Sequence, residues 1–161
     1  RNNIICNNSF CTYSIMPDYK KYFIDILKRT EKMSTCESTQ VGCIIVRDGR
    51  IISTGWNGVP AGKKHCNEIY AFGALPTNGE NHHDWSPLNE LHAETNAIGY
   101  AAQNGVSTKG AILYTSVSPC MDCAKLIVAS GIKEVWYIKE YYRTIAGIDF
   151  LNDNKIGCKR L

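Results

Sequence analysis

Two short motifs carry side chains that could bind a metal ion and move protons. His92-Ala93-Glu94 supplies an imidazole and a carboxylate, and Pro119-Cys120-Met121-Asp122-Cys123 supplies two thiols. Imidazole and thiolate are ligands that zinc prefers, and three of them leave the fourth tetrahedral position open for water. An open position is typical of a catalytic zinc, whose bound water becomes acidic enough to act as a nucleophile. The motifs therefore predict a catalytic zinc held by His92, Cys120 and Cys123.

Glu94 is the candidate general acid/base. It lies two residues from His92, a spacing that does not place both side chains on one helix face, so we interpret it as a proton carrier rather than a ligand. Histidine-x-glutamate followed by Pro-Cys-x-x-Cys is the known signature of zinc deaminases that act on nucleobases. The alternative is a structural zinc knuckle with Glu94 solvated. That alternative needs a fourth protein ligand, and Asp122 does not share the face of the two cysteines.

Helix starts are predicted to position both motifs. Apolar residues at helical spacing follow His92 and end at Asn104-Gly105, and a second apolar helix runs from Cys120 to Ser130. His92, Cys120 and Cys123 then lie in first turns, where the partial positive charge of a helix N-terminus favours thiolates.

The rest of the pattern predicts an α/β fold. The expected elements are a helix over 18–32, strands over 41–46 and 51–55 around an Asp48-Gly49 turn, strands over 111–117 and 134–138, and a short helix within 141–154. The strands 111–117 and 134–138 are joined through a helix and should be parallel. We predict a three-layer αβα architecture, with a mixed central sheet of about five strands and helices on both faces. Residues 63–90 show neither a helical nor a strand period.

Composition limits the class of protein. A chain of 161 residues with a net charge of +3 fits one domain, and no run of apolar residues is long enough to span a membrane. The placement of the eight cysteines does not indicate a disulfide framework. Cys120 and Cys123 form a pair with metal-binding spacing, and Cys43 lies in a predicted apolar strand. We therefore expect a reducing cytoplasm. Residues 1–15 are expected to be a disordered or added extension before Met16, and residues 16–161 a single zinc-dependent domain.

A glycine-rich loop and a long insert follow the first two strands. Residues 55–62 contain three glycines around Asn57, which allows close approach of the backbone to a ligand. The insert over 63–90 contains the potential ligands Cys66, His65, His82, His83 and Glu90, with Cys36 just before the first strand. Either these residues hold a second metal ion, or the insert is a lid with scattered polar side chains.

The sequence resembles the deoxycytidylate (dCMP) deaminases of the cytidine deaminase superfamily, bacteriophage members in particular. The resemblance covers roughly residues 33–142 and includes the long insert, which compact tRNA adenosine deaminases lack. The matching motifs are Gln40-Val41-Gly42, Gly49-Arg50-Ile51-Ile52-Ser53-Thr54-Gly55-Trp56-Asn57-Gly58, Asn89-Glu90-Leu91-His92-Ala93-Glu94, Ser118-Pro119-Cys120 and Ser130-Gly131-Ile132-Lys133.

This resemblance implies the cytidine-deaminase fold and a set of roles. His92, Cys120 and Cys123 would bind the catalytic zinc and Glu94 would shuttle protons, so that dCMP is hydrolysed to dUMP for dTMP synthesis. Asn57 would contact the deoxyribose, and Tyr141 would lie near the substrate. A second zinc, as in phage members, would be bound by Cys36, Cys66, His82 and Glu90. Ser38 and Thr39, just before the first strand, are further candidates for substrate contact.

Regulation and assembly are also implied by the resemblance. Family members are often hexamers that dCTP activates with Mg²⁺ and dTTP inhibits, and Gly58, Lys63 and Lys64 could meet such a triphosphate. Gln103 departs from the arginine that phage relatives tend to carry at that point.

Two other readings remain open. One is a deaminase of cytosine or adenine in nucleic acid, although the only aromatic and basic cluster is Tyr141-Tyr142-Arg143. The other is a catalytically inactive, zinc-stabilised binding protein of the same fold.

Overall fold

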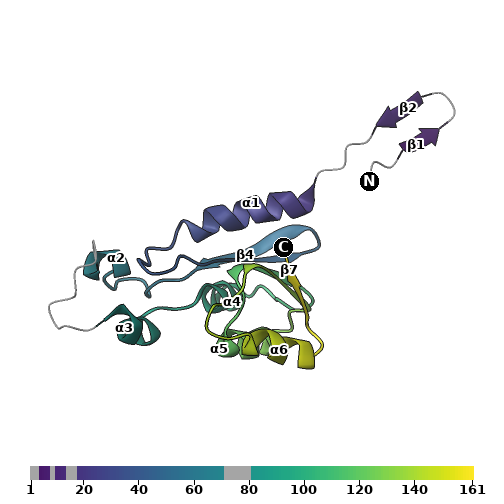
Figure 1. Ribbon diagram of the computed structural model, residues 1–161. Helices are drawn as coiled ribbons and strands as arrows, with labels where there is room; N and C mark the ends of the chain where they lie inside the picture. Colours follow the sequence, from purple (N-terminus) through teal and green to yellow (C-terminus); the bar gives the residue numbers. More distant parts are fainter. Residues whose placement is uncertain (1–3, 8–9, 14–17, 71–80) are drawn as a thin grey trace.

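A five-stranded mixed sheet forms the centre of the molecule (Figure 1). The computed structural model describes residues 4–7, 10–13, 18–70 and 81–161. The strand order is β4-β3-β5-β6-β7, with β3 antiparallel to β4 and β5, and β5, β6 and β7 parallel. The parallel pairing of the two strands around the second motif is thus confirmed. The strands are β3 (Gly42–Arg47), β4 (Arg50–Trp56), β5 (Ile112–Val117), β6 (Glu134–Lys139) and β7 (Gly157–Arg160).

A tight turn joins β3 to β4. Asp48 and Gly49 have φ angles of 52° and 73°, the left-handed conformation that a type I′ turn needs at both central residues. Asn, Asp and Gly tolerate this conformation best, which is why the Asp-Gly pair predicted the hairpin correctly.

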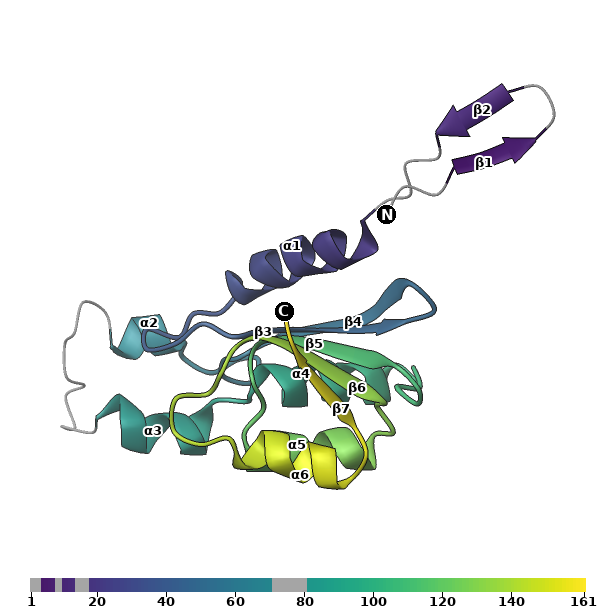
Figure 2. The ribbon, with the colours of Figure 1, turned by 45° about the vertical axis from the view of Figure 1, so that its right-hand side comes forward.

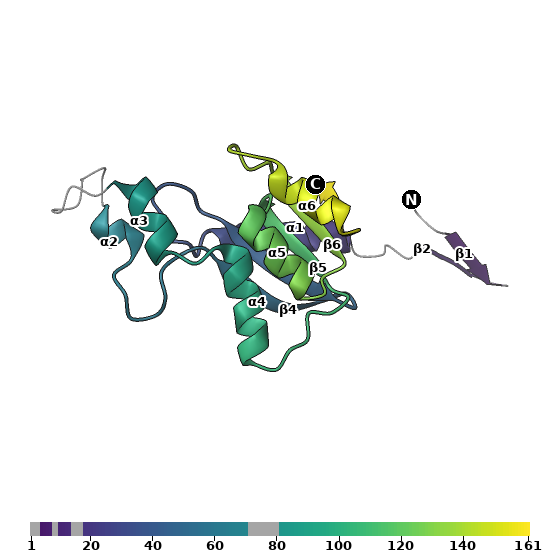
Figure 3. The ribbon, with the colours of Figure 1, turned by 90° about the horizontal axis from the view of Figure 1, so that it is seen from below.

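Helices cover both faces of the sheet. Helix α1 (Tyr19–Glu31) packs on β3 and β5 on one face. On the other face lie α4 (Ala93–Gln103), α5 (Met121–Ala129) and α6 (Ala146–Asp153) (Figure 2). Seen from below, these three helices lie next to one another under the strands (Figure 3). The predicted three-layer αβα architecture is confirmed.

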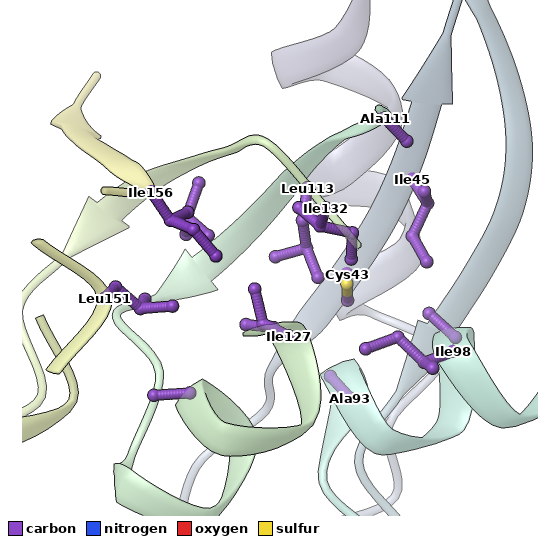
Figure 4. Packing of buried hydrophobic residues seen from close by; sticks show 13 residues of the cluster. Cys43, Ile45, Ala93, Ile98, Ala111, Leu113, Ile127, Ile132, Leu151 and Ile156 are labelled. Carbon is purple, nitrogen blue, oxygen red and sulfur yellow. The ribbon is translucent and has the colours of Figure 1, made fainter. Parts of the chain in front are cut away.

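Alternation along β3 explains why both faces are covered. Ile45 belongs to the cluster that lies between the sheet and helices α4 and α5, whereas Ile44 and Val46 belong to the cluster with α1. Side chains alternate across a strand, so a continuous apolar run must be buried on both faces. The same cluster also contains Leu113, Ile127 and Leu151, all fully buried (Figure 4). Val135 belongs to it as well and is fully buried. Burial of one such side chain contributes about 1.5–3 kcal/mol.

The expectation that residues 63–90 contain no regular structure is wrong in two places. Helices α2 (Cys66–Ile69) and α3 (His82–Asn89) lie there, and residues 71–80 fall outside the described chain. Both helices are too short to show a period in sequence. They are stabilised by tertiary packing, because Cys66, Tyr70 and Trp85 form a buried cluster of their own. Strand β7 was missed for a related reason, since it is a short, mostly exposed edge strand.

A separate pair of strands precedes α1. Strands β1 (Ile4–Asn7) and β2 (Phe10–Tyr13) pair with each other in antiparallel fashion and do not join the central sheet. The stretch 1–15 was expected to be a disordered or added extension, and it contains these paired strands. Its separation from a domain over 16–161 stays a prediction. Across the residues that can be described, every helix is too short or too polar to cross a bilayer.

Candidate active site

The start of α4 faces the start of α5, and this brings the three predicted zinc ligands together. His92 is the N-cap residue of α4, Cys120 is the N-cap residue of α5, and Cys123 lies in the first turn of α5. The His92 Nδ1 atom lies 3.3 Å from Cys123 Sγ and 3.4 Å from Cys120 Sγ. A tetrahedral zinc separates its nitrogen and sulfur ligands by roughly 3.5 Å. The donor set and its spacing therefore fit a zinc ion.

Among the residues that the structure describes, this cluster contains no fourth protein ligand. The Asp122 side chain is 93% exposed and pairs with Lys125 at 3.8 Å. A zinc ion at this place would keep one coordination position for water, as catalytic rather than structural sites do.

The thiols of the cluster differ in acidity. A hydrogen bond from Cys123 stabilises the Cys120 thiolate and lowers the pKa of Cys120 to about 3. The pKa of Cys123 rises, because its thiol retains the shared proton and is buried. The hydrogen bond with Cys120 also raises the pKa of His92. Zinc binds thiolates and neutral imidazole, so a bound ion would displace these protons.

Glu94 lies beside the cluster and is only 4% exposed. Its Oε2 atom is 3.5 Å from Cys123 Sγ, and its Oε1 atom is 3.4 Å from the hydroxyl of Thr115 on β5. Burial raises the pKa of the Glu94 carboxyl group. A carboxyl group with a raised pKa exchanges protons more readily near neutral pH, as a general acid/base must.

Helix α4 is seated on β4 through a glycine. A Cβ atom at Gly55 would lie 2.5 Å from both Ala93 O and Ala97 N, so only glycine lets the helix approach this closely. The hydroxyl of Ser53 donates to Ala97 O at 2.6 Å and reinforces the contact. This close contact between α4 and β4 fixes the distance of His92 and Glu94 from the sheet.

Helix α6 also makes a close contact through a glycine, here with the backbone of the cysteine motif. A Cβ atom at Gly147 would collide with Pro119 O and would lie 3.0 Å from the carbonyl carbon of Cys120. The first turn of α6 thus contacts the backbone that carries a predicted zinc ligand.

A cavity of about 550 Å³ opens above the cluster, and His92, Glu94 and Cys120 line it. Its size lies in the range typical of small-molecule sites. The predicted substrate residues Asn57, Ser38, Thr39 and Tyr141 also line the cavity.

Asn57 uses its amide group to hold the cavity wall. Its Oδ1 atom accepts from Val41 N at 2.7 Å, and its Nδ2 atom donates to Thr39 O at 2.9 Å. The family resemblance implied a sugar contact for Asn57, which stays a prediction, and the structure adds these two hydrogen bonds to the backbone of the wall.

The predicted effector residues Gly58, Lys63 and Lys64 do not line this cavity. Gly58 instead exchanges two hydrogen bonds with Leu91, of 3.1 and 2.8 Å, next to His92. The loop over 55–62 therefore supports the start of α4.

A second cluster brings together all four residues that the resemblance implied for a second metal. The ligand atoms of Cys36, Cys66, His82 and Glu90 all lie within 4.8 Å of one another. Cys36 Sγ is 3.4 Å from His82 Nε2 and 3.6 Å from Glu90 Oε2. Burial raises the pKa of Cys66 to about 12 and also raises the pKa of Cys36. Four protein ligands are typical of a closed, structural zinc site.

Glu90 gives a further indication that the second cluster binds a metal ion. Its Oε2 atom accepts from the hydroxyl of Ser86 at 2.6 Å, whereas its buried Oε1 atom has no hydrogen-bond partner among the described residues. A buried, unsatisfied carboxylate oxygen costs free energy, and a metal ion would satisfy it. The other predicted ligands, His65 and His83, lie outside this cluster.

Sequence reasoning missed several cavity residues. Ser118 donates its backbone N–H to Lys139 O and accepts from Tyr141 N, both at 2.8 Å, and so ties the end of β6 to the cavity floor. Arg143 also lines the cavity. The sequence showed Ser118 in the Ser118-Pro119-Cys120 motif and Arg143 in the Tyr141-Tyr142-Arg143 cluster, but it assigned neither side chain a role in this site.

Comparison with known proteins places this site in context. The profile described as the cytidine and deoxycytidylate deaminase zinc-binding region matches residues 17–139. A deoxycytidylate deaminase of Enterobacteria phage T2 is 39% identical over 145 residues, which cover 72% of this chain and 77% of that protein. A deoxycytidylate deaminase of Mycobacterium phage D29 is 37% identical over 126 residues, which cover 77% of this chain and 97% of that protein. The crystal structure of the dCMP deaminase from cyanophage S-TIM5 with dCMP and dUMP superposes with a TM-score of 0.77 at 31% identity, and the match covers 92% of this chain and 100% of that one.

Proposed function

The chain belongs to the family of cytidine and deoxycytidylate deaminases, and we propose that it hydrolyses dCMP to dUMP and ammonia. The observation that carries this proposal is the buried Glu94 beside a three-ligand zinc site on the floor of a nucleotide-sized cavity. The dUMP formed would supply dTMP synthesis.

The chain's own residues account for the proton transfers. His92, Cys120 and Cys123 would hold the zinc ion, which when bound would supply the Lewis acidity that makes a water molecule more acidic and more nucleophilic. Glu94 takes the proton of that water and delivers it to N3 of cytosine as the oxygen adds to C4. Glu94 then takes the proton of the new C4 hydroxyl and delivers it to the departing amino group, so that ammonia leaves and the C4 carbonyl of uracil forms. The hydroxyl of Thr115 lies 3.4 Å from the other carboxyl oxygen of Glu94 and also donates to Val117 O at 2.9 Å.

We also propose that the second cluster binds a structural zinc. Its support is the closed set of four ligands and the unsatisfied Glu90 Oε1 atom. Loss of this ion would remove the metal bonds of two buried thiols and leave the buried Glu90 Oε1 atom unsatisfied, which costs stability. Activation by dCTP with Mg²⁺, inhibition by dTTP, a hexameric assembly and a cytoplasmic location stay predictions.

The substitution Glu94→Gln tests the catalytic assignment. It keeps the size of the side chain but removes the proton carrier, so ammonia release from dCMP should fall by about 10²- to 10⁴-fold while the zinc content is unchanged. Ammonia release and metal analysis on the same preparation measure both. Deamination of dCMP by this variant at the wild-type rate would show that Glu94 is not the proton carrier.

The choice of substrate needs a separate comparison. Wild-type protein is assayed on deoxycytidine, dCMP, dCTP and a single-stranded cytosine oligonucleotide, each with and without added dCTP and dTTP. We expect dCMP to be the preferred substrate. Preference for the oligonucleotide would favour a nucleic-acid deaminase, and zinc content without any ammonia release would favour a binding protein.

A further inference from the structure

Helix α3 presents one polar face to the catalytic cavity. His82, Ser86 and Glu90, the last of which is the C-cap residue, follow one another at intervals of four residues. This spacing places side chains on the same side of a helix. All three residues line the cavity. Two of them are proposed ligands of the second metal, and Ser86 lies between them.

The Glu90 carboxylate is buried and has few partners. Its side chain is 3% exposed, and its Oε2 atom lies 3.8 Å from His82 Nε2. In the described parts of the chain, no lysine or arginine pairs with it. A buried carboxylate keeps its charge only where donors or a cation replace the lost solvent. The second cluster therefore depends on a group that holds this carboxylate in place for a metal ion.

Ser86 holds Glu90 through both its side chain and its backbone. The Ser86 hydroxyl donates to Glu90 Oε2 at 2.6 Å, and the Ser86 carbonyl oxygen accepts the Glu90 N–H at 2.8 Å. A hydrogen bond to an ionised acceptor is stronger than one between neutral groups. Cys36 and His82 also lie near Oε2, but both are proposed ligands themselves. Among the described residues, Ser86 is thus the one hydrogen-bond donor to this carboxylate that is not a proposed ligand.

We propose that Ser86 is the positioning residue of the second metal site. Its hydroxyl fixes the Glu90 carboxylate in the orientation in which it shares an ion with the other three ligands. This inference rests on the proposed structural zinc. Groups that hydrogen-bond to metal ligands orient them and raise metal affinity. Because Ser86 also lines the cavity, the same hydroxyl ties the metal site to the wall that faces the substrate.

The effect of Ser86 should stay within the second site. Leu91 separates Glu90 from the catalytic ligand His92. It exchanges two hydrogen bonds with Gly58, of 3.1 and 2.8 Å. This pairing with a neighbouring segment holds the start of α4 independently of the Glu90 side chain. Loss of the Ser86 hydroxyl should therefore weaken the second metal site and leave the first unchanged.

The test measures zinc affinity, so that it does not depend on turnover. Zinc-loaded wild-type, Ser86→Ala and Ser86→Thr proteins are titrated with a chelator of known zinc affinity, and the zinc released per chain is measured. The release step that Cys66→Ser abolishes belongs to the second site. The affinity of that site should fall by about 10- to 100-fold in Ser86→Ala. Ser86→Thr keeps the hydroxyl and should restore the affinity, and the other release step should be unchanged in both variants.

Leu88→Ala is the matched control for these substitutions. Leu88 lies on the same helix, is 81% exposed and does not line the cavity. This variant should release both ions as the wild-type protein does.

The outcomes separate the role of Ser86 from the second site itself. Two zinc ions in the wild-type protein and an unchanged second step in Ser86→Ala would overturn the role of Ser86 and keep the site. Equal weakening in Ser86→Ala and Ser86→Thr, or of both release steps, would also overturn it, since the hydroxyl would then not be the cause. A single zinc in the wild-type protein would refute the site and this inference together. The proposed deamination is judged separately, by the Glu94→Gln assay.

Discussion

At the scale of single residues, the two buried polar side chains Glu94 and Asn57 line the same cavity but have different roles. Glu94 is held by few groups, and its raised pKa leaves it able to gain and lose a proton. Asn57 is held at both ends of its amide group by the backbone of Thr39 and Val41. An amide without a titratable proton can brace a wall but cannot catalyse proton transfer. Position in the hydrogen-bond network therefore separates the catalytic residue from the supporting one.

The substitution Asn57→Ala should affect both stability and substrate affinity. It leaves Val41 N and Thr39 O without their partners, which costs about 1–3 kcal/mol of unfolding free energy for a buried group. The loosened wall should also raise the KM for dCMP. Denaturant unfolding and steady-state kinetics measure the two effects. Asn152→Ala, at an exposed position of α6, is the control and should change neither. An Asn57→Ala protein with wild-type stability and KM would contradict the bracing role.

At the scale of elements, the site depends on how closely two helices approach their supports. Gly55 lets α4 lie on β4, and Gly147 lets α6 lie against the Pro119-Cys120 backbone. Because glycine has no side chain, Gly55 allows the close approach that positions the start of α4 beside His92. Gly147 in the same way allows α6 to contact the backbone beside Cys120 at the start of α5. Helix starts are suited to this task because they offer free N–H groups and favour thiolates.

The substitution Gly147→Ala should displace Cys120. The added Cβ collides with Pro119 O, so either α6 or the cysteine motif must move. We expect a loss of bound zinc and a fall in kcat of at least about 10-fold, since small misplacements of catalytic groups cost about this much or more. Metal analysis and kinetics measure both.

Gly99→Ala on α4 is the matched control for this change. A Cβ atom there meets nothing within 4 Å, and alanine favours a helix over glycine by about 1 kcal/mol. That variant should keep its zinc and be equally or more stable. If Gly147→Ala behaves in the same way, the contact between α6 and the motif does not position Cys120.

At the scale of the whole molecule, two metal clusters share one cavity. Cys36, His82 and Glu90 line it together with His92 and Cys120. The first set joins the segment before β3 to α3, and the second set joins α4 to α5. A metal in each cluster would thus stabilise a different part of the cavity lining, one for shape and one for chemistry.

The substitution Cys66→Ser should separate these roles. Cys66 belongs to the second cluster but does not line the cavity. We expect the metal content to fall from two zinc ions per chain to one, with a lower Tm, because the remaining buried ligands lose their partner. The half-buried Cys158 on β7 belongs to neither cluster, so Cys158→Ser should keep both ions. A single zinc in the wild-type protein would refute the second site.

Long elements and local motifs were predictable from the sequence, whereas short elements were not. Helices α1, α4 and α5 and the β3–β4 hairpin show clear periods or turn chemistry, which act over a few neighbouring residues. Helices α2 and α3 and strand β7 have no such signal. They form because Tyr70, Trp85 and the edge of β6 provide partners far away in the chain.

The sequence by itself determined the chemistry of the zinc ligands, because the donor types and their places at helix starts are local properties. It also determined the order of the main layers through hydrophobic periodicity. Only the tertiary structure decided which distant residues meet: Cys36 with Glu90, Gly147 with the Pro119 carbonyl, and Glu140 with Arg160. Such contacts depend on how the chain closes on itself, and residue spacing along the chain does not encode that distance.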